Sequence, residues 1–173
     1  MSETLTVLKT RRSCRAYKPE PIEEEKLNAI IEAGTYAATG MGKQSPIIIA
    51  VKDKALREKL SKMNAAIMGV NIDPFYGAPE LLIVLANKEM PTYIYDGSLV
   101  MGNMMNAAAD LGVASCWIHR AKEEFESEEG KAILKDLGIE GDYEGIGHCV
   151  LGYSDQPAPA GAPRKDGRVF WAE

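Results

Sequence analysis

The segment from Thr92 to Leu111 places the strongest constraint on how this chain folds. It predicts a long helix that ends before Gly112. Apolar side chains surround almost its whole circumference: Ile94, Leu99, Val100, Met101, Met104, Met105, Ala107, Ala108 and Ala109. A helix of this kind must be buried on several sides. It serves equally well as the central helix of a monomer or as a contact between two subunits, and both interpretations stay open from this segment alone.

Shorter periodic segments predict the remaining elements. Further helices are predicted over residues 3–10, 21–34, 54–68 and 123–137. Ser2 and Asp53 are the expected N-terminal caps, while Pro21 is expected in the first turn of its helix and Gly34 at its end. Strands are predicted over residues 47–51, 81–85, 113–118 and 145–153.

Two of these elements carry more specific expectations. Residues 47–51 are apolar on both faces and are therefore expected to form a covered central strand. The helix over 54–68 is expected to bury one apolar side, made of Leu56, Leu60, Met63 and Ile67. Residues 156–163 contain three prolines and predict an extended tail without a core of its own.

Length and charge limit the possible functions. A chain of 173 residues predicts a single domain over 1–173. Its net charge of −5 argues against general nucleic-acid binding, which needs a broad basic face. We expect no membrane span, because no apolar run approaches about 20 residues. The three cysteines form no C-x-x-C pair and the first residues resemble no signal peptide, so the sequence predicts a cytoplasmic protein with reduced thiols.

Two basic clusters stand out in this acidic chain, Arg11–Arg15 and Arg164–Arg168. Guanidinium groups match phosphate or carboxylate with paired hydrogen bonds. In an extended backbone, Arg11, Ser13 and Arg15 point to one side and can converge on an anion. Each unit-charge pair at about 4 Å is worth ~4 kcal/mol before desolvation. If the fold joins the two clusters, they can enclose one phosphate; the alternative is a solvated basic turn and a solvated tail.

Other chemical signatures are missing from the sequence. No Walker loop is present, and the glycines after Gly145 lie within a predicted strand, which excludes a dinucleotide-binding fingerprint. His119 and His148 have no ligand-spaced partner, so no metal site is predicted. Cys149 and His148 point to opposite faces of a strand and cannot act as a pair. An enzyme without a nucleophile, acid–base pair or metal needs a cofactor to carry the chemistry.

Five segments in order resemble the nitroreductase family of FMN-dependent oxidoreductases. They cover nearly the whole chain: Arg11–Tyr17, Lys43–Pro46, Gly77–Pro79, Asp96–Ile118 and Leu151–Gly152–Tyr153 followed by Pro163–Arg164–Lys165. The resemblance implies an α+β fold with a mixed central sheet flanked by helices. It also implies an intertwined homodimer with FMN at the subunit interface, in which the long helix forms the dimer core.

The resemblance also implies roles for individual residues. The phosphate and ribityl chain are assigned to Arg11, Arg12, Ser13 and Arg15, completed by Arg164. The flavin ring is assigned to Lys43, Gln44 and the backbone near Trp117, Ile118 and His119. Gly42 and Ala162 depart from the family pattern, which often has an asparagine and a second basic residue at these positions.

The implied activity is ping-pong hydride transfer from NADH or NADPH through FMN to a small electron-poor acceptor, such as a nitro compound or quinone. No catalytic side chain is assigned. One alternative is a flavin-binding redox module without efficient turnover. Another is a protein that binds a phosphorylated metabolite and no flavin.

Overall fold

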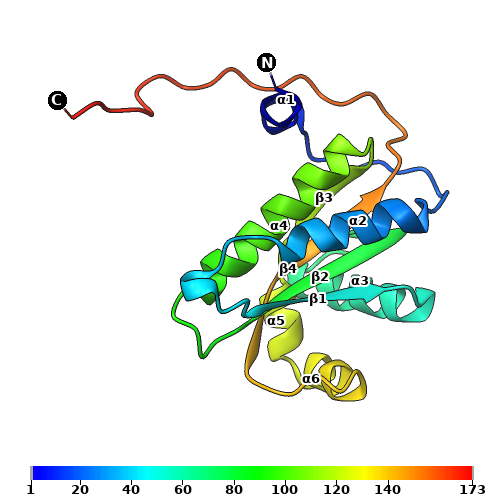
Figure 1. Ribbon diagram of the computed structural model, residues 1–173. Helices are drawn as coiled ribbons and strands as arrows, with labels where there is room; N and C mark the ends of the chain where they lie inside the picture. Colours follow the sequence, from blue (N-terminus) through cyan, green and yellow to red (C-terminus); the bar gives the residue numbers. More distant parts are fainter. Residues whose placement is uncertain (1, 173) are drawn as a thin grey trace.

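The computed structural model describes residues 2–172, and its helices and strands form three layers (Figure 1). The elements are α1 (Glu3–Thr10), α2 (Glu24–Thr35), the short 3₁₀ helix η1 (Gly40–Gly42), β1 (Pro46–Val51), α3 (Lys54–Met68), β2 (Glu80–Asn87), α4 (Tyr93–Asp110), β3 (Ala114–Ile118), α5 (Ala121–Glu126), α6 (Glu128–Asp136) and β4 (Tyr143–Gly152). In Figure 1 the sheet has α2 and α4 on one face and α3, α5 and α6 on the other. This arrangement confirms the predicted α+β class.

The four strands follow the order β1-β2-β4-β3, and neighbouring strands are antiparallel. The mixed character expected of the sheet is confined to an isolated parallel bridge between Ser13 and Ser115. The prediction that residues 47–51 form a central strand was wrong, because β1 lies at the edge and pairs only with β2 among the strands. Its two apolar faces still have partners: Ile47 packs against one helix layer and Ile48 against the other.

Strand β2 explains why the core divides into two halves. Leu81, Ile83 and Leu85 point into the layer formed with α3, α5 and α6, while Leu82 and Val84 point toward α2 and α4. All five side chains are at most 1% exposed. Alternate residues of a strand face opposite sides, so a central strand covered on both faces is apolar throughout.

The long helix predicted near Thr92 is confirmed as α4. Met101 and Met104 lie on its buried face and belong to the half of the core that α2 and α4 form with the sheet. Its other face leaves Ile94 46%, Tyr95 72% and Leu99 49% exposed. The apolar circumference is therefore only half covered within one chain.

The predicted caps of α1 and α3 are confirmed. The Ser2 hydroxyl accepts a hydrogen bond from the Leu5 N–H, and the Asp53 carboxylate accepts from the N–H groups of Ala55 and Leu56. Ile67, however, is 42% exposed and does not belong to the buried side of α3.

The predictions for both ends of α2 were wrong. The helix begins at Glu24 rather than near Pro21, because the preceding segment stays extended and buries Ile22 in the core. Gly34 lies inside the helix rather than at its end. A Cβ atom at Gly34 would lie 2.7 Å from Met104 Cγ, so this glycine permits close packing of α2 on α4.

The single helix predicted over residues 123–137 is broken at Ser127. This residue has an extended backbone (φ −69°, ψ 157°) and ends α5. Its hydroxyl caps α6 by accepting a 3.0 Å hydrogen bond from the Gly130 N–H. A Cβ at Gly130 would lie 2.0 Å from the Glu124 carbonyl oxygen, so the glycine lets the two helices fold tightly together.

Asp73 organises the loop between α3 and β2. Its carboxylate accepts hydrogen bonds from the Ser61 hydroxyl, the Arg57 guanidinium, and the N–H groups of Phe75 and Gly77, over 2.7–3.0 Å. Burial raises the pKa of Asp73, but these donors together lower it below its usual value. A pKa that is lower in the folded state stabilises the fold above pH ~4, and this stabilisation is lost as the pH falls further.

We predict that Asp73→Asn lowers the free energy of unfolding by about 2 kcal/mol at neutral pH, because several donors lose a charged acceptor. The difference between the native protein and the variant should shrink below pH ~4, where the native carboxyl becomes protonated. Urea unfolding at pH 7 and near pH 3.5 measures this, with Asp166→Asn in the exposed tail as control. A difference that is equal at both pH values would contradict the prediction.

Candidate functional site

The Arg11–Arg15 segment is fixed in an extended conformation between two parts of the sheet. The Cys14 N–H donates to the Ser115 carbonyl at 3.0 Å, beside the bridge that joins Ser13 and Ser115. Just beyond it, the Lys18 N–H donates to the Tyr153 carbonyl at 2.9 Å. The segment is therefore anchored at the start of β3 and at the end of β4. We call residues 11–15 the basic segment.

Several side chains of the basic segment act on the Cys116 thiol. Burial raises the pKa of Cys116 and Cys14 adds to this effect, whereas Arg15, the Ser13 hydroxyl and Arg11 lower it. Arg11 is partly buried, and its Nη1 has no hydrogen-bond partner among residues 2–172. An unpaired buried guanidinium nitrogen is costly, so this position favours an anionic acceptor.

The chain leaving β4 passes directly over the basic segment. The Asp155 N–H donates to the Ala16 carbonyl at 3.0 Å, and a pocket of about 290 Å³ lies between residues 12–16 and 154–159. Gly161 lies so close to Arg12 that a Cβ there would be 1.9 Å from Arg12 Nη2. The structure thus brings the tail and the basic segment together.

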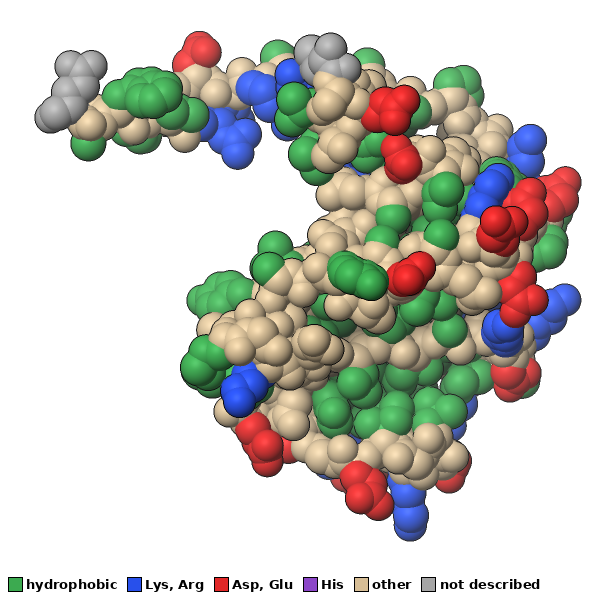
Figure 2. Space-filling view, viewed as in Figure 1, with side chains coloured by type: hydrophobic (Ala, Val, Ile, Leu, Met, Phe, Trp, Pro, Cys, Tyr) green, Lys and Arg blue, Asp and Glu red, His purple; other side chains and the backbone are tan. Residues whose placement is uncertain are grey.

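Arg164 lies beyond this pocket. Its Nη2 donates to the Ala162 carbonyl at 2.6 Å, and its side chain is exposed. The tail that carries it stands clear of the rest of the chain, with hydrophobic side chains near its far end (Figure 2). Within one chain, Arg164 is therefore close in sequence to the pocket but does not line it.

Lys43 and Gln44 lie in the turn that follows η1, with both side chains exposed. Asp96, in the first turn of α4 and only 3% exposed, holds this turn in place. Its carboxylate accepts from the Gly40 N–H at 3.0 Å and from the Ser45 hydroxyl at 3.3 Å. The turn is thereby fixed at the N-terminal end of α4.

The basic segment and the Lys43–Gln44 turn lie at opposite ends of α4 (Figure 1). The 18 residues of α4 span about 27 Å. The structure therefore does not bring these two predicted groups of site residues together within one chain.

The third predicted group lies at the end of β3. The rings of Trp117 and His119 are 5.9 Å apart between centroids and line a pocket of about 590 Å³ next to the first turns of α4. Ile118 points the other way, into the core, and is 5% exposed. Trp117 lies across Gly147 of β4, where a Cβ would be 2.2 Å from its Nε1. Only the backbone of Ile118 is available to a ligand.

Asn64 fixes the backbone at this end of β3, and sequence reasoning missed it. It is fully buried, its amide donates to the His119 carbonyl at 2.8 Å, and its oxygen accepts from Arg120 Nε at 2.8 Å. Arg120 holds a left-handed backbone conformation at φ 77°, which reverses the chain into α5. The available signal was a polar residue four positions after Leu60, on the buried side of the helix.

The family model described as "Nitroreductase family" matches residues 8–74 and 68–153. The chain belongs to the nitroreductase family. It is similar to an Archaeoglobus fulgidus protein named "Putative NADH dehydrogenase/NAD(P)H nitroreductase", with 31% identity over 158 residues, covering 88% of this chain and 86% of that protein.

Solved nitroreductase structures have the same fold. An FMN-bound nitroreductase of Bacteroides fragilis is 30% identical, with a TM-score of 0.91 over the full length of both chains. An FMN-bound nitroreductase of Desulfitobacterium hafniense is 28% identical, with a TM-score of 0.89 over the full length of both chains. The expected resemblance to this family is thus confirmed.

Two further findings concern the described residues alone. Between residues 2 and 172, no helix combines the length and apolar character that crossing a membrane requires. The same residues contain no group of three or more His, Cys, Asp or Glu side chains arranged to hold a metal ion.

We predict that Asn64→Ala lowers the free energy of unfolding by about 2–3 kcal/mol, because it leaves the His119 carbonyl and the Arg120 guanidinium without their buried partner. Urea denaturation of the full chain measures the change. Asn28→Ala, on the exposed side of α2, is the matched control and should stay within about 0.5 kcal/mol of the native protein. Equal stabilities of the two variants would refute this role of Asn64.

Proposed function

We propose that this nitroreductase-family chain is an FMN-dependent oxidoreductase that uses NADH or NADPH to reduce a small electron-poor acceptor, such as a nitro compound or quinone. When bound, FMN would supply the hydride chemistry that links the nicotinamide to the acceptor. The FMN-bound relatives from Bacteroides fragilis and Desulfitobacterium hafniense support this proposal. The protein is expected to act in the cytoplasm as a single domain over residues 1–173.

The observation that carries the proposal is the unpaired Nη1 of Arg11 in the basic segment. This nitrogen is buried and positively charged, so a phosphate would supply the acceptor that the chain lacks. Arg11 does not itself line the pocket of about 290 Å³, but its neighbours Arg12 and Ser13 do. The residues present therefore fit the phosphate end of FMN.

The remaining candidate residues bind or orient the cofactor. Arg15 is exposed at the end of the basic segment and provides positive charge toward an anionic flavin. Trp117 and the backbone through Ile118 and His119 would cover the ring edge, held by the two hydrogen bonds of Asn64. These side chains exclude water and fix the cofactor, and we assign none of them as a catalytic acid or base.

The site also requires a second copy of the chain, so we propose a homodimer. Lys43 and Gln44 lie one helix length from the basic segment of their own chain. If the exposed apolar faces of two α4 helices pack antiparallel, the N-terminal end of one helix lies beside the C-terminal end of the other. The partner's turn would then reach the flavin, and the tail carrying Arg164 would lie across the other subunit.

We predict that the purified full-length protein binds FMN and is yellow. Under anaerobic conditions, NADH or NADPH should bleach the flavin absorbance, and a nitroaromatic compound or quinone should restore it. Arg11→Ala should weaken FMN binding at least about tenfold, because a charged hydrogen bond is worth about 1.5–3 kcal/mol. Flavin fluorescence titration measures that affinity.

Lys135→Ala, on the exposed surface of α6, is the control and should leave FMN affinity unchanged. Bleaching without recovery by any acceptor would support the redox module without turnover. A colourless protein that ignores added FMN would instead favour a binder of phosphorylated metabolites and would overturn the proposal.

For the dimer, we predict a solution mass of twice 18.9 kDa. Leu99→Glu should weaken dimerisation at least a hundredfold and release FMN as well, because burying an unpaired carboxylate costs roughly 3–5 kcal/mol. Light scattering after size exclusion measures the mass. Leu137→Glu is the control, since Leu137 is 47% exposed against 49% for Leu99 but lies at the end of α6. A native monomer that retains FMN would contradict the shared site.

A further inference from the structure

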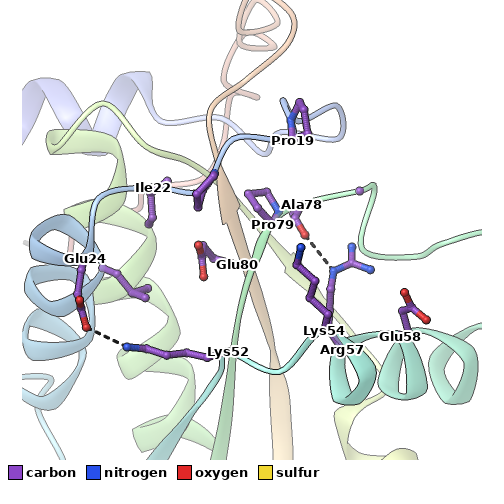
Figure 3. Close-up of a pocket in the computed structure, with 13 residues that line it drawn as sticks. Pro19, Ile22, Glu24, Lys52, Lys54, Arg57, Glu58, Ala78, Pro79 and Glu80 are labelled. Atoms are coloured by element: carbon purple, nitrogen blue, oxygen red, sulfur yellow. Dashed lines mark hydrogen bonds and ion pairs between the residues drawn. The ribbon is translucent and has the colours of Figure 1, made fainter.

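A second pocket, of about 560 Å³, is lined by none of the candidate flavin residues. Figure 3 shows the residues that line it. It is bounded by the segment before α2, the start of α3 and the residues that lead into β2. Its apolar lining includes Pro21, Ile22, Leu27 and Pro79. The volume lies within the range of small-molecule sites. None of the residues that line it belongs to the basic segment, the Lys43–Gln44 turn or the end of β3.

Three acidic and three basic side chains line this pocket, so their formal charges balance: Glu24, Glu58, Glu80, Lys52, Lys54 and Arg57. Lys52 Nζ is engaged by Glu24 at 2.9 Å, and Arg57 Nη2 is engaged at 2.9 Å by Asp73, which lies outside the lining. With Asp73 counted, four carboxylates stand against three cations, a net charge of −1.

Glu80 is the carboxylate best placed to bind a ligand. In Figure 3 it lies in the middle of the pocket, between Ile22 and Lys54. Its side chain is partly buried, and no ion pair to it is formed within 4.0 Å among the described residues. Burial raises the pKa of Glu80, while Lys52 and the Ile22 N–H lower it to a smaller extent. A partly desolvated carboxylate without a close cation is stabilised by a ligand that supplies one.

We propose that this pocket binds a small primary amine with an apolar body. The ammonium group pairs with Glu80, and the apolar body packs on Pro21, Ile22 and Pro79. An anionic ligand is disfavoured by the net charge of −1, and a neutral one leaves Glu80 without a close cation. The site shares no residue with the flavin site, so the proposal does not depend on the proposed function.

Isothermal titration of the full-length protein with isoamylamine tests the proposal, and isoamyl alcohol is the uncharged probe of nearly the same shape. We expect saturable one-site binding of the amine and at least tenfold weaker binding of the alcohol. Equal binding of the two probes, or no binding of the amine at 10 mM-scale concentrations, overturns the proposal. This comparison uses only the native protein and needs no variant to fold.

Glu80→Gln keeps the size of the side chain and removes its charge, so it should weaken amine binding at least tenfold. Glu25→Gln removes the same charge from an exposed position of α2 outside the pocket and should leave the affinity unchanged. If Glu25→Gln weakens amine binding as much as Glu80→Gln does, the loss of affinity comes from the overall negative potential of the acidic surface. The assignment of the amine to Glu80 then fails.

Discussion

The pairing of β4 with both β2 and β3 determines where the candidate site lies. Strand β4 is the last strand in the sequence, but it lies between β2 and β3, which precede it in the sequence, and it is antiparallel to each. Gly152, at its end, pairs with Ala114 at the start of β3. The chain therefore leaves the sheet beside the basic segment, where Asp155 bonds to the Ala16 backbone. The tail and the basic segment, about 140 residues apart in the sequence, therefore meet because of the order of the strands. No attraction between the two basic clusters is needed to bring them together.

Local sequence signals predicted the elements whose boundaries depend on nearby residues. Ser2 and Asp53 cap helices because their side chains accept from N–H groups two or three residues later. The apolar run over residues 81–85 predicted a strand, and β2 contains it with both of its faces covered. Each of these conclusions needs only a few consecutive residues, which is why the sequence was sufficient.

Features set by distant contacts were not predictable in this way. The apolar run of β1 is as strong as that of a central strand, but β4 takes the central place and leaves β1 at the edge. Gly34 has the character of a helix end, yet its role is to admit Met104 from α4. Asn64 and Asp96 are each a polar residue on the buried side of a helix. Asn64 donates to the His119 carbonyl and Asp96 accepts from the Gly40 N–H, and both of these partners lie tens of residues away in the sequence. Only the assembled fold reveals that both hold parts of the candidate site.

The tail gives an independent physical reason to expect a second subunit. Residues 155–172 are exposed along their whole length, and Phe170 and Trp171 are both 87% exposed. Ordering each residue costs about 1–2 kcal/mol of conformational entropy, and this segment buries little apolar surface of its own to offset that cost. The same chain leaves Leu5, Leu8 and Leu99 about half exposed on α1 and α4.

In the proposed homodimer, the exposed apolar surface of the helices in one copy would cover the apolar end of the tail from the other copy. In the proposed dimer, burial of Phe170 and Trp171 would offset part of the ordering cost, since a large apolar side chain contributes about 1.5–3 kcal/mol when fully buried. Ordering the tail also fixes Arg164, which has only its own Ala162 carbonyl as a partner within the described chain. Cofactor binding and subunit exchange would then be thermodynamically coupled, because phosphate pairing and aromatic burial order the same segment.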